Sequence, residues 1–140
     1  MKFWDTSAIG PLFFDEESSP AVTALWQADP KLAIWLLTDV ELCSALQRRV
    51  RAGQVSARDA FQVLTSIDRA LATAVVVTDH AQARGQARGL LTKHPLRAAD
   101  ALQLGAALCF TAGRPDTLPF VCLDDRLRAA AKAEGFPVLP

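Results

Sequence analysis

A chain of 140 residues is long enough to bury a core of its own without disulfides or a structural metal, and we expect one domain over residues 1–140. Hydrophobic residues make up 51% of the chain and charged residues 21%, a composition that excludes an intrinsically disordered protein. Fifteen basic residues balance fifteen acidic ones, so net charge cannot attract a polyanion, and a nucleic acid would need a local basic patch.

The cysteines and the N-terminal residues favour a cytoplasmic protein. Cys43, Cys109 and Cys122 are odd in number and far apart, so we expect neither a disulfide framework nor a zinc site. The first ten residues include Asp5 and no long apolar run, which is unlike a signal peptide. Because no segment is long and uncharged enough to cross a bilayer, we expect no membrane partner.

Short apolar runs alternate with longer helical patterns along the chain. In chain order, the apolar runs predict strands over residues 2–4, 31–37, 74–77, 119–123 and 136–139. The patterns between them predict helices over residues 19–26, 38–51, 56–73, 79–93, 95–112 and 125–134. This alternation indicates parallel βαβ units, and we predict an α/β fold, a three-layer sandwich in which helices flank a central parallel sheet.

Four acidic residues lie where such a sheet binds ligands, beyond the carboxyl ends of its strands. Asp5 follows the first predicted strand and Asp124 the fourth. Glu41 lies in the first turn after the second strand, and Asp100 lies in the helix that precedes the fourth. If the first strand is central and the second and fourth lie on either side of it, the four carboxylates meet in one pocket.

Four carboxylates in one pocket need a compensating positive charge, because like charges raise one another's pKa. A hard divalent cation with oxygen ligands supplies that charge, and the absence of a histidine or cysteine pair among the candidates favours Mg²⁺ or Mn²⁺ over zinc. A carboxylate-bound cation of this kind suits the hydrolysis of phosphodiester bonds.

Each of these acids also has a purely structural interpretation. Glu41 stands three residues after Thr38, so that the two residues match a helix capping box. Asp5 is compatible with a turn cap, and the adjacent Asp124 and Asp125 with acids in the first turn of a helix, where the helix dipole favours them.

Asp100 is the hardest of the four to explain structurally. If Pro95 is the first helical residue, Asp100 lies beyond the first turn and cannot cap the helix. A surface ion pair with Arg97, three residues earlier, is the remaining alternative. The hypothesis of a cation site therefore depends on all four acids together.

The segments FWDTSAI, TDVELCSAL, RAADALQLGAAL and FVCLDDRLRAAAKAEGFPVL resemble the four acidic motifs of the PIN domain, in the right order and over essentially the whole chain. The short chain is similar to VapC-type toxins of toxin–antitoxin pairs. The resemblance implies a sheet of order 3-2-1-4-5, a Mg²⁺- or Mn²⁺-dependent ribonuclease, an RNA substrate, a homodimer and a VapB-like antitoxin. It implies metal binding and catalysis by Asp5, Glu41, Asp100 and Asp124.

The resemblance also implies auxiliary residues. Thr6 and Ser7 match the hydroxyl positions after the first acid, where they hold a metal-bound water or a phosphate, and Asp125 is a possible auxiliary acid. Cys122 departs from the family pattern, which often has Thr or Ser two residues before the fourth acid, and we expect a thiol there to weaken support of Asp124.

An RNA substrate would need basic residues around the pocket. The candidates are Arg48, Arg49, Arg51, Lys93, Arg97 and Arg126, each of which could equally belong to a solvated helix face. The alternative function is a catalytically silent PIN-like scaffold that binds RNA or protein. A Rossmann-like nucleotide binder is disfavoured because the first strand is followed by no glycine-rich turn.

Overall fold

The computed structural model describes residues 1–140, and its strands form a single parallel sheet. The strands are β1 (Lys2–Trp4), β2 (Leu32–Trp35), β3 (Val75–Val77), β4 (Phe120–Val121) and β5 (Val138–Leu139). Their order is β3-β2-β1-β4-β5, and every neighbouring pair is parallel. The predicted sheet order is therefore confirmed. It places β1 at the centre, with β2 and β4 on either side.

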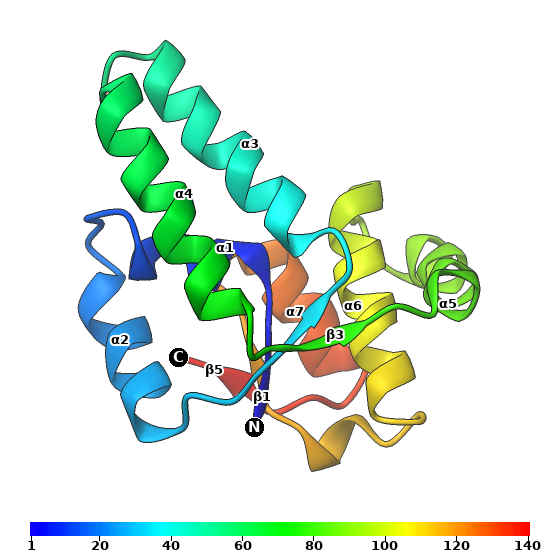
Figure 1. Cartoon of the computed structure of the whole chain (residues 1–140). Coiled ribbons are helices and arrows are strands. Elements are labelled where there is room, and N and C mark those ends of the chain that lie inside the picture. The colour runs from blue at the N-terminus through cyan, green and yellow to red at the C-terminus, as the bar shows by residue number, and fades with distance from the viewer.

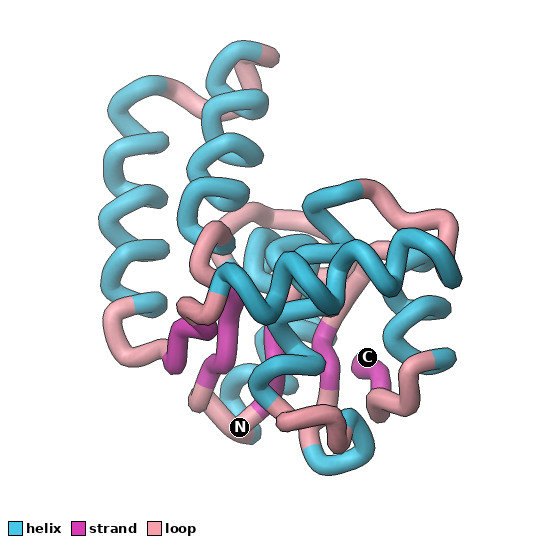
Figure 2. The backbone as a smooth tube through the Cα atoms, turned by 90° about the vertical axis from the view of Figure 1, so that its right-hand side faces the viewer, coloured by secondary structure: helices cyan, strands magenta, loops and turns pink.

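Helices surround this sheet, and the α3–α4 pair extends beyond it as a projecting hairpin (Figures 1 and 2). The α-helices are α1 (Thr6–Ile9), α2 (Ser19–Ala28), α3 (Thr38–Arg51), α4 (Ala57–Leu71), α5 (His80–Lys93), α6 (Ala98–Phe110) and α7 (Asp125–Ala133). Two short 3-10 helices, η1 (Gly10–Leu12) and η2 (Pro115–Thr117), complete the chain. None of the helices combines the length and apolar character that crossing a membrane would require.

The two faces of the sheet pack into separate hydrophobic cores, because successive side chains of a strand point to opposite faces. Phe3 packs with Phe120 and with side chains of α5, α6 and α7. Trp4, the next residue, packs with Ile34 and with side chains of α1, α2, α3 and α4. The predicted three-layer sandwich is thus confirmed, with α1–α4 on one face and α5–α7 on the other.

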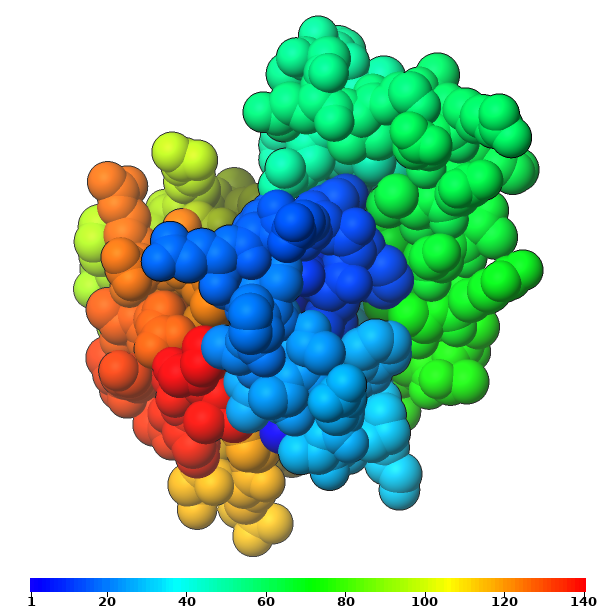
Figure 3. Space-filling model, turned by 90° about the vertical axis from the view of Figure 1, so that its left-hand side faces the viewer, coloured from blue at the N-terminus to red at the C-terminus, as the bar shows by residue number.

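The space-filling view shows how the layers meet on one side of the molecule (Figure 3). There the N-terminal segment, in blue, lies between the green α3–α4 hairpin and the orange and red C-terminal segment. The start of the chain therefore lies between the two halves of the protein on this side.

One helix begins later than the sequence predicts, and another begins at the predicted residue with a different cap. Helix α6 begins at Ala98 with Arg97 as its N-cap, so Asp100 lies in the first turn and the predicted start at Pro95 is wrong. Helix α3 has Leu37 as its N-cap, without a side-chain cap bond, while Thr38 is fully buried. The capping-box interpretation of Glu41 is therefore wrong, and its carboxylate is used elsewhere.

Candidate active site

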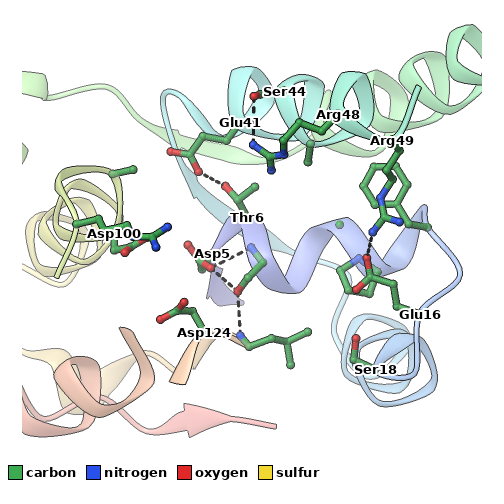
Figure 4. A pocket seen from close by; sticks show the side chains of 18 residues that line it. Asp5, Thr6, Glu16, Ser18, Glu41, Ser44, Arg48, Arg49, Asp100 and Asp124 are labelled. Carbon is green, nitrogen blue, oxygen red and sulfur yellow. Dashed lines mark hydrogen bonds and ion pairs between the residues drawn. The ribbon is translucent and has the colours of Figure 1, made fainter. Parts of the chain in front are cut away.

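A pocket of about 820 Å³ opens beyond the carboxyl ends of the central strands and is lined by all four candidate carboxylates. Asp5 lies in its middle, and Glu41, Asp100 and Asp124 approach it from three other elements (Figure 4). The sheet order produces this meeting, since β1 delivers Asp5 between the segments that follow β2 and β4. The structure thus brings together the four acids that the sequence singled out.

Asp5 is the most buried of the four, with only 5% of the residue exposed. Its Oδ2 atom accepts a hydrogen bond from the main-chain N–H of Ser7 at 2.9 Å and another from Ser7 Oγ at 2.5 Å. Burial is the main reason why the pKa of Asp5 is raised to about 6, and the nearby Glu41 and Asp100 charges add to it. The ionised form of Asp5 therefore lacks a positive partner.

The hydroxyl of Ser7 joins the ends of the two central strands. While it donates to Asp5 Oδ2, it accepts the main-chain N–H of Leu123 at 2.9 Å. The thiol of Cys122 contacts Asp5 Oδ2, Ser7 Oγ and the main-chain oxygen of Asp124, each at 3.6 Å. The thiol therefore contacts one carboxylate, that of Asp5, and the main chain of Asp124, and its expected effect on the support of Asp124 stays a prediction.

Glu41 is held by two side chains from other parts of the fold. Its Oε2 atom accepts a hydrogen bond from Thr6 Oγ1 at 2.5 Å and another from Gln103 Nε2 at 2.9 Å. The hydroxyl proton of Thr6 is thereby used by a carboxylate, as is that of Ser7. A role for either hydroxyl in holding water or phosphate stays a prediction.

Asp100 and Asp124 face each other across the pocket from α6 and the start of α7 (Figure 4). The pKa of Asp100 is raised, first by burial and then by the charge of Asp124, while Arg97 and Arg126 counteract the rise. Asp124 is the N-cap of α7, where its Oδ1 atom accepts the N–H of Leu127 at 2.9 Å.

The neighbouring acid, Asp125, does not line this pocket. It borders a separate hollow together with His94 and Arg126. Of the two adjacent aspartates, Asp124 is therefore the one placed among the other carboxylates.

The four carboxylates keep free oxygen atoms. Asp5, Glu41 and Asp124 each use one oxygen in the hydrogen bonds described above, and the other oxygen has no protein partner. None of the four acids forms an ion pair. No three histidine, cysteine or acidic side chains lie close enough together to hold a single ion by themselves. A cation at these free oxygens would need further oxygen ligands, such as water or a substrate phosphate, to complete its coordination.

The basic residues divide into two groups. Arg48, Arg49 and Arg97 line the pocket. The guanidinium of Arg49 is paired with Glu16 and lies 4.5 Å from the centre of the Phe14 ring, so its charge is partly used within the protein.

The other three basic candidates lie elsewhere. Lys93 is 3.3 Å from Glu134, on the surface. Arg51 borders a separate hollow beside α3, and Arg126 borders the hollow that contains His94. None of these three residues lines the pocket, so the structure does not support their prediction as RNA contacts.

Two further residues line or support the site without having been predicted from the sequence. Gln103 bonds to Glu41 and Thr6, although in sequence it reads as one polar residue in an apolar helix. Its spacing from Asp100, three residues on the same helix face, is the signal that could have found it. Glu16 lines the pocket from the loop before α2, where nothing in the sequence distinguishes it from other surface acids.

No protein-family model and no curated protein matches the chain. Solved structures do. A toxin–antitoxin complex from Klebsiella pneumoniae matches with a TM-score of 0.69 and 18% identity, over 100% of this chain and 97% of that one. VapC20 of Mycobacterium tuberculosis, described as a toxin that cleaves the sarcin-ricin loop, matches with a TM-score of 0.69 and 22% identity over 100% of both chains. FitAcB of Neisseria gonorrhoeae matches with a TM-score of 0.66 and 16% identity, over 100% and 97%. The chain therefore has the fold of these proteins, and the PIN-type fold that its sequence implied is confirmed.

Proposed function

We propose that the chain is a ribonuclease of the VapC type, the toxin of a toxin–antitoxin pair, and that it hydrolyses RNA with Mg²⁺, or Mn²⁺ as a substitute, at the acidic pocket. One observation carries this proposal. Four carboxylates from four different elements line one pocket, and none of them has a basic partner. The fold that the chain shares with VapC20, an RNA-cleaving toxin, supports the same reading.

The residues present fit a hard divalent cation. Mg²⁺ is usually bound by one or two carboxylates, while water and substrate phosphate complete its coordination. Pairs of free carboxylate oxygens therefore suffice where three protein ligands are not close together. Burial of Asp5 without a positive neighbour, which raises its pKa to about 6, also fits a site where a cation supplies the missing charge. When bound, such an ion supplies charge stabilisation at a phosphoryl oxygen.

The protein's own groups have separate tasks in this proposal. Asp5 and Asp124 present one carboxylate oxygen each, while their second oxygen is held by main-chain N–H groups of Ser7 and Leu127. Asp100 presents its carboxylate to the same pocket from α6, opposite Asp124, as a further ligand for the cation. Arg48 and Arg97 line the same pocket and can bind flanking phosphates of a single strand.

The proposed partners follow from the same comparison. Since a structure with this fold is described as a toxin–antitoxin complex, a VapB-like antitoxin is the proposed inhibitor. We further propose a homodimer that acts in the cytoplasm. Size-exclusion chromatography with light scattering tests the dimer, and co-purification with the product of the adjacent reading frame tests the antitoxin.

An RNA cleavage assay tests the function. The full chain is incubated with total RNA and with a synthetic sarcin-ricin loop, in Mg²⁺, in Mn²⁺ or in EDTA. We expect cleavage only with a metal, and a loss of at least about 100-fold in the Asp5→Asn and Asp100→Asn variants. Asp79→Asn is the matched control, because Asp79 caps α5 outside the pocket and asparagine caps equally well.

The outcome also decides between the two candidate functions. If the wild type and both pocket variants are equally inert on every RNA with metal present, the chain is a silent scaffold and the ribonuclease proposal is wrong. If Asp79→Asn loses activity as completely as the pocket variants, the acidic pocket is not what carries the reaction.

A further inference from the structure

Gln103 is a fully buried amide that connects three segments beside the pocket. It lies on α6 one turn beyond Asp100. Its Nε2 atom lies 2.9 Å from Thr6 Oγ1, 2.9 Å from Glu41 Oε2 and 3.5 Å from Thr38 Oγ1. These acceptors belong to α1 and α3, so one side chain of α6 holds the first turns of both helices together.

The neighbours of this amide determine which way it faces. Thr6 donates its hydroxyl proton to Glu41, so towards Gln103 it can only accept, and the Glu41 carboxylate can only accept as well. A reversed amide would direct its oxygen at two acceptors, and the NH₂ group must therefore be the end that faces them. The other end, Oε1, remains buried without any hydrogen-bond partner.

A buried oxygen without a partner lowers the stability of the fold, and an apolar side chain of the same length would avoid that loss. The hydrogen bonds within the pocket suggest why an amide is present at this position. Asp5 and Asp124 are each held by a main-chain N–H of the segment that follows them. Glu41 has a longer side chain and no main-chain donor, and only Thr6 and Gln103 hold its carboxylate in place.

We propose that Gln103 is a positioning residue for the acidic pocket. It fixes Oε2 of Glu41, and thereby keeps the free oxygen, Oε1, in one position for a divalent cation. A neutral amide cannot lose a proton in the working pH range, so it remains a donor to Glu41 at any pH where the carboxylate is ionised. This inference rests on the proposed function, because it requires a cation at the pocket.

Calorimetric titration of the full chain with Mn²⁺ alone tests the inference without any RNA. In the Gln103→Met variant the side chain keeps its length and loses both N–H groups. We expect its Mn²⁺ affinity to fall by about 10-fold or more, as is typical when a residue that orients a metal ligand is removed. The melting temperature of the metal-free variant reports separately on the fold, because the substitution removes the unpartnered oxygen together with the hydrogen bonds to Thr6 and Glu41. Gln103→Leu serves as a second apolar variant if the Gln103→Met protein does not fold.

Two controls separate positioning from a general effect on the fold. Thr111 is a buried polar residue at the other end of α6, bonded to main-chain oxygens of Ala107 and Leu108, and Thr111→Val should change the Mn²⁺ affinity less than twofold. If Gln103 acts through Glu41, adding Gln103→Met to a Glu41→Gln variant should weaken binding no further. An additive loss in the double variant overturns the inference.

The remaining outcomes are equally decisive. A Gln103→Met variant that binds Mn²⁺ within twofold of the wild type, or that only melts at a lower temperature, overturns the inference, as does a wild type that binds no Mn²⁺. Tenfold weaker binding by the variant, together with a wild type that cuts no RNA, supports the role of Gln103 while the ribonuclease proposal fails. If RNA is cut, kcat should fall in the variant with KM for RNA unchanged.

Discussion

The thiol of Cys122 lies 3.6 Å from Oδ2 of Asp5, beneath the most buried carboxylate of the protein. Burial raises the pKa of this thiol well above its usual value, so Cys122 remains neutral and acts as a weak donor to Asp5. The two residues directly follow neighbouring strands, β1 and β4, and this contact links the chemistry of the pocket to the packing of the sheet.

This contact predicts opposite effects of two substitutions. In Cys122→Ser a hydroxyl, which is the stronger donor, should favour the ionised carboxylate and lower the pKa of Asp5. Cys122→Val removes the donor and should raise that pKa. Carboxyl-carbon NMR titration measures both. Shifts of the same sign in the two variants would contradict a hydrogen bond from this position.

The raised pKa of Asp5 predicts that stability falls with pH. Its carboxyl titrates near 6 in the folded protein and near 3.8 when unfolded, so the folded state binds the proton more tightly. Below pH 3.8 both states are protonated and the effect vanishes; between pH 4 and 6 the unfolded state loses its proton first, and the free energy of unfolding should fall. At about 1.4 kcal/mol per pKa unit, the loss above pH 6 amounts to about 3 kcal/mol.

Urea unfolding of the metal-free protein from pH 4 to pH 8 measures this dependence. Asp5→Asn should remove most of this pH dependence. The variant should also be more stable than the wild type at pH 7, because a neutral amide replaces a buried charge. Added Mn²⁺ should raise the melting temperature of the wild type more than that of the variant. If the Asp5→Asn variant is less stable than the wild type at pH 7, the ionised Asp5 carboxylate does not lower the stability of the folded protein as predicted.

The packing of α5 against α6 predicts a strong effect of one methyl group. A Cβ atom on Gly105 would lie 2.6 Å from the main-chain oxygen of Ala83, so Gly105→Ala must push the helices apart. We expect a loss of about 1–3 kcal/mol in the free energy of unfolding. Gly85→Ala and Gly89→Ala are matched controls on α5, where a Cβ meets nothing within 4 Å, and each should gain up to about 1 kcal/mol from helix propensity.

The division of the basic residues predicts different effects on RNA binding. Arg97 lines the pocket, whereas Lys93 is paired with Glu134 on the surface. With EDTA present to prevent cleavage, Arg97→Ala should weaken RNA binding several-fold and reduce the slope of log affinity against log salt by about 1. Lys93→Ala should bind within twofold of the wild type. Equal effects of the two substitutions would show that binding follows overall charge and not the pocket.

Much of the fold could be predicted because strands and helices have distinct periods in this sequence. Adjacent residues such as Phe3 and Trp4 enter different cores, as alternation in a strand requires. The order of the strands came from the resemblance of the acidic motifs and not from periodicity. Helix starts were less predictable. Proline is frequent at the first helical position, yet Pro95 belongs to the loop before Ala98.

The acids of the site could be predicted and their environment could not. Position after a strand is a local property, which is why Asp5 and Asp124 were found. The partners of Glu41 depend on three helices meeting, and the pattern Thr38–Glu41 indicated a capping box that the structure does not form. Gln103 depends on the same meeting. Which arginines reach the pocket depends on the direction of α3, and local sequence does not contain that direction.

The alternation of Phe3 and Trp4 has a consequence for how this protein can vary. Each is fully buried, one in the layer of α5–α7 and the other in the layer of α1–α4, and Asp5 is the residue that follows. The position of its carboxylate is therefore set by both halves of the molecule at once. A substitution in either core that shifts β1 displaces Asp5 as well, so mutational tolerance in the interior is limited by the geometry of the pocket and not by stability alone.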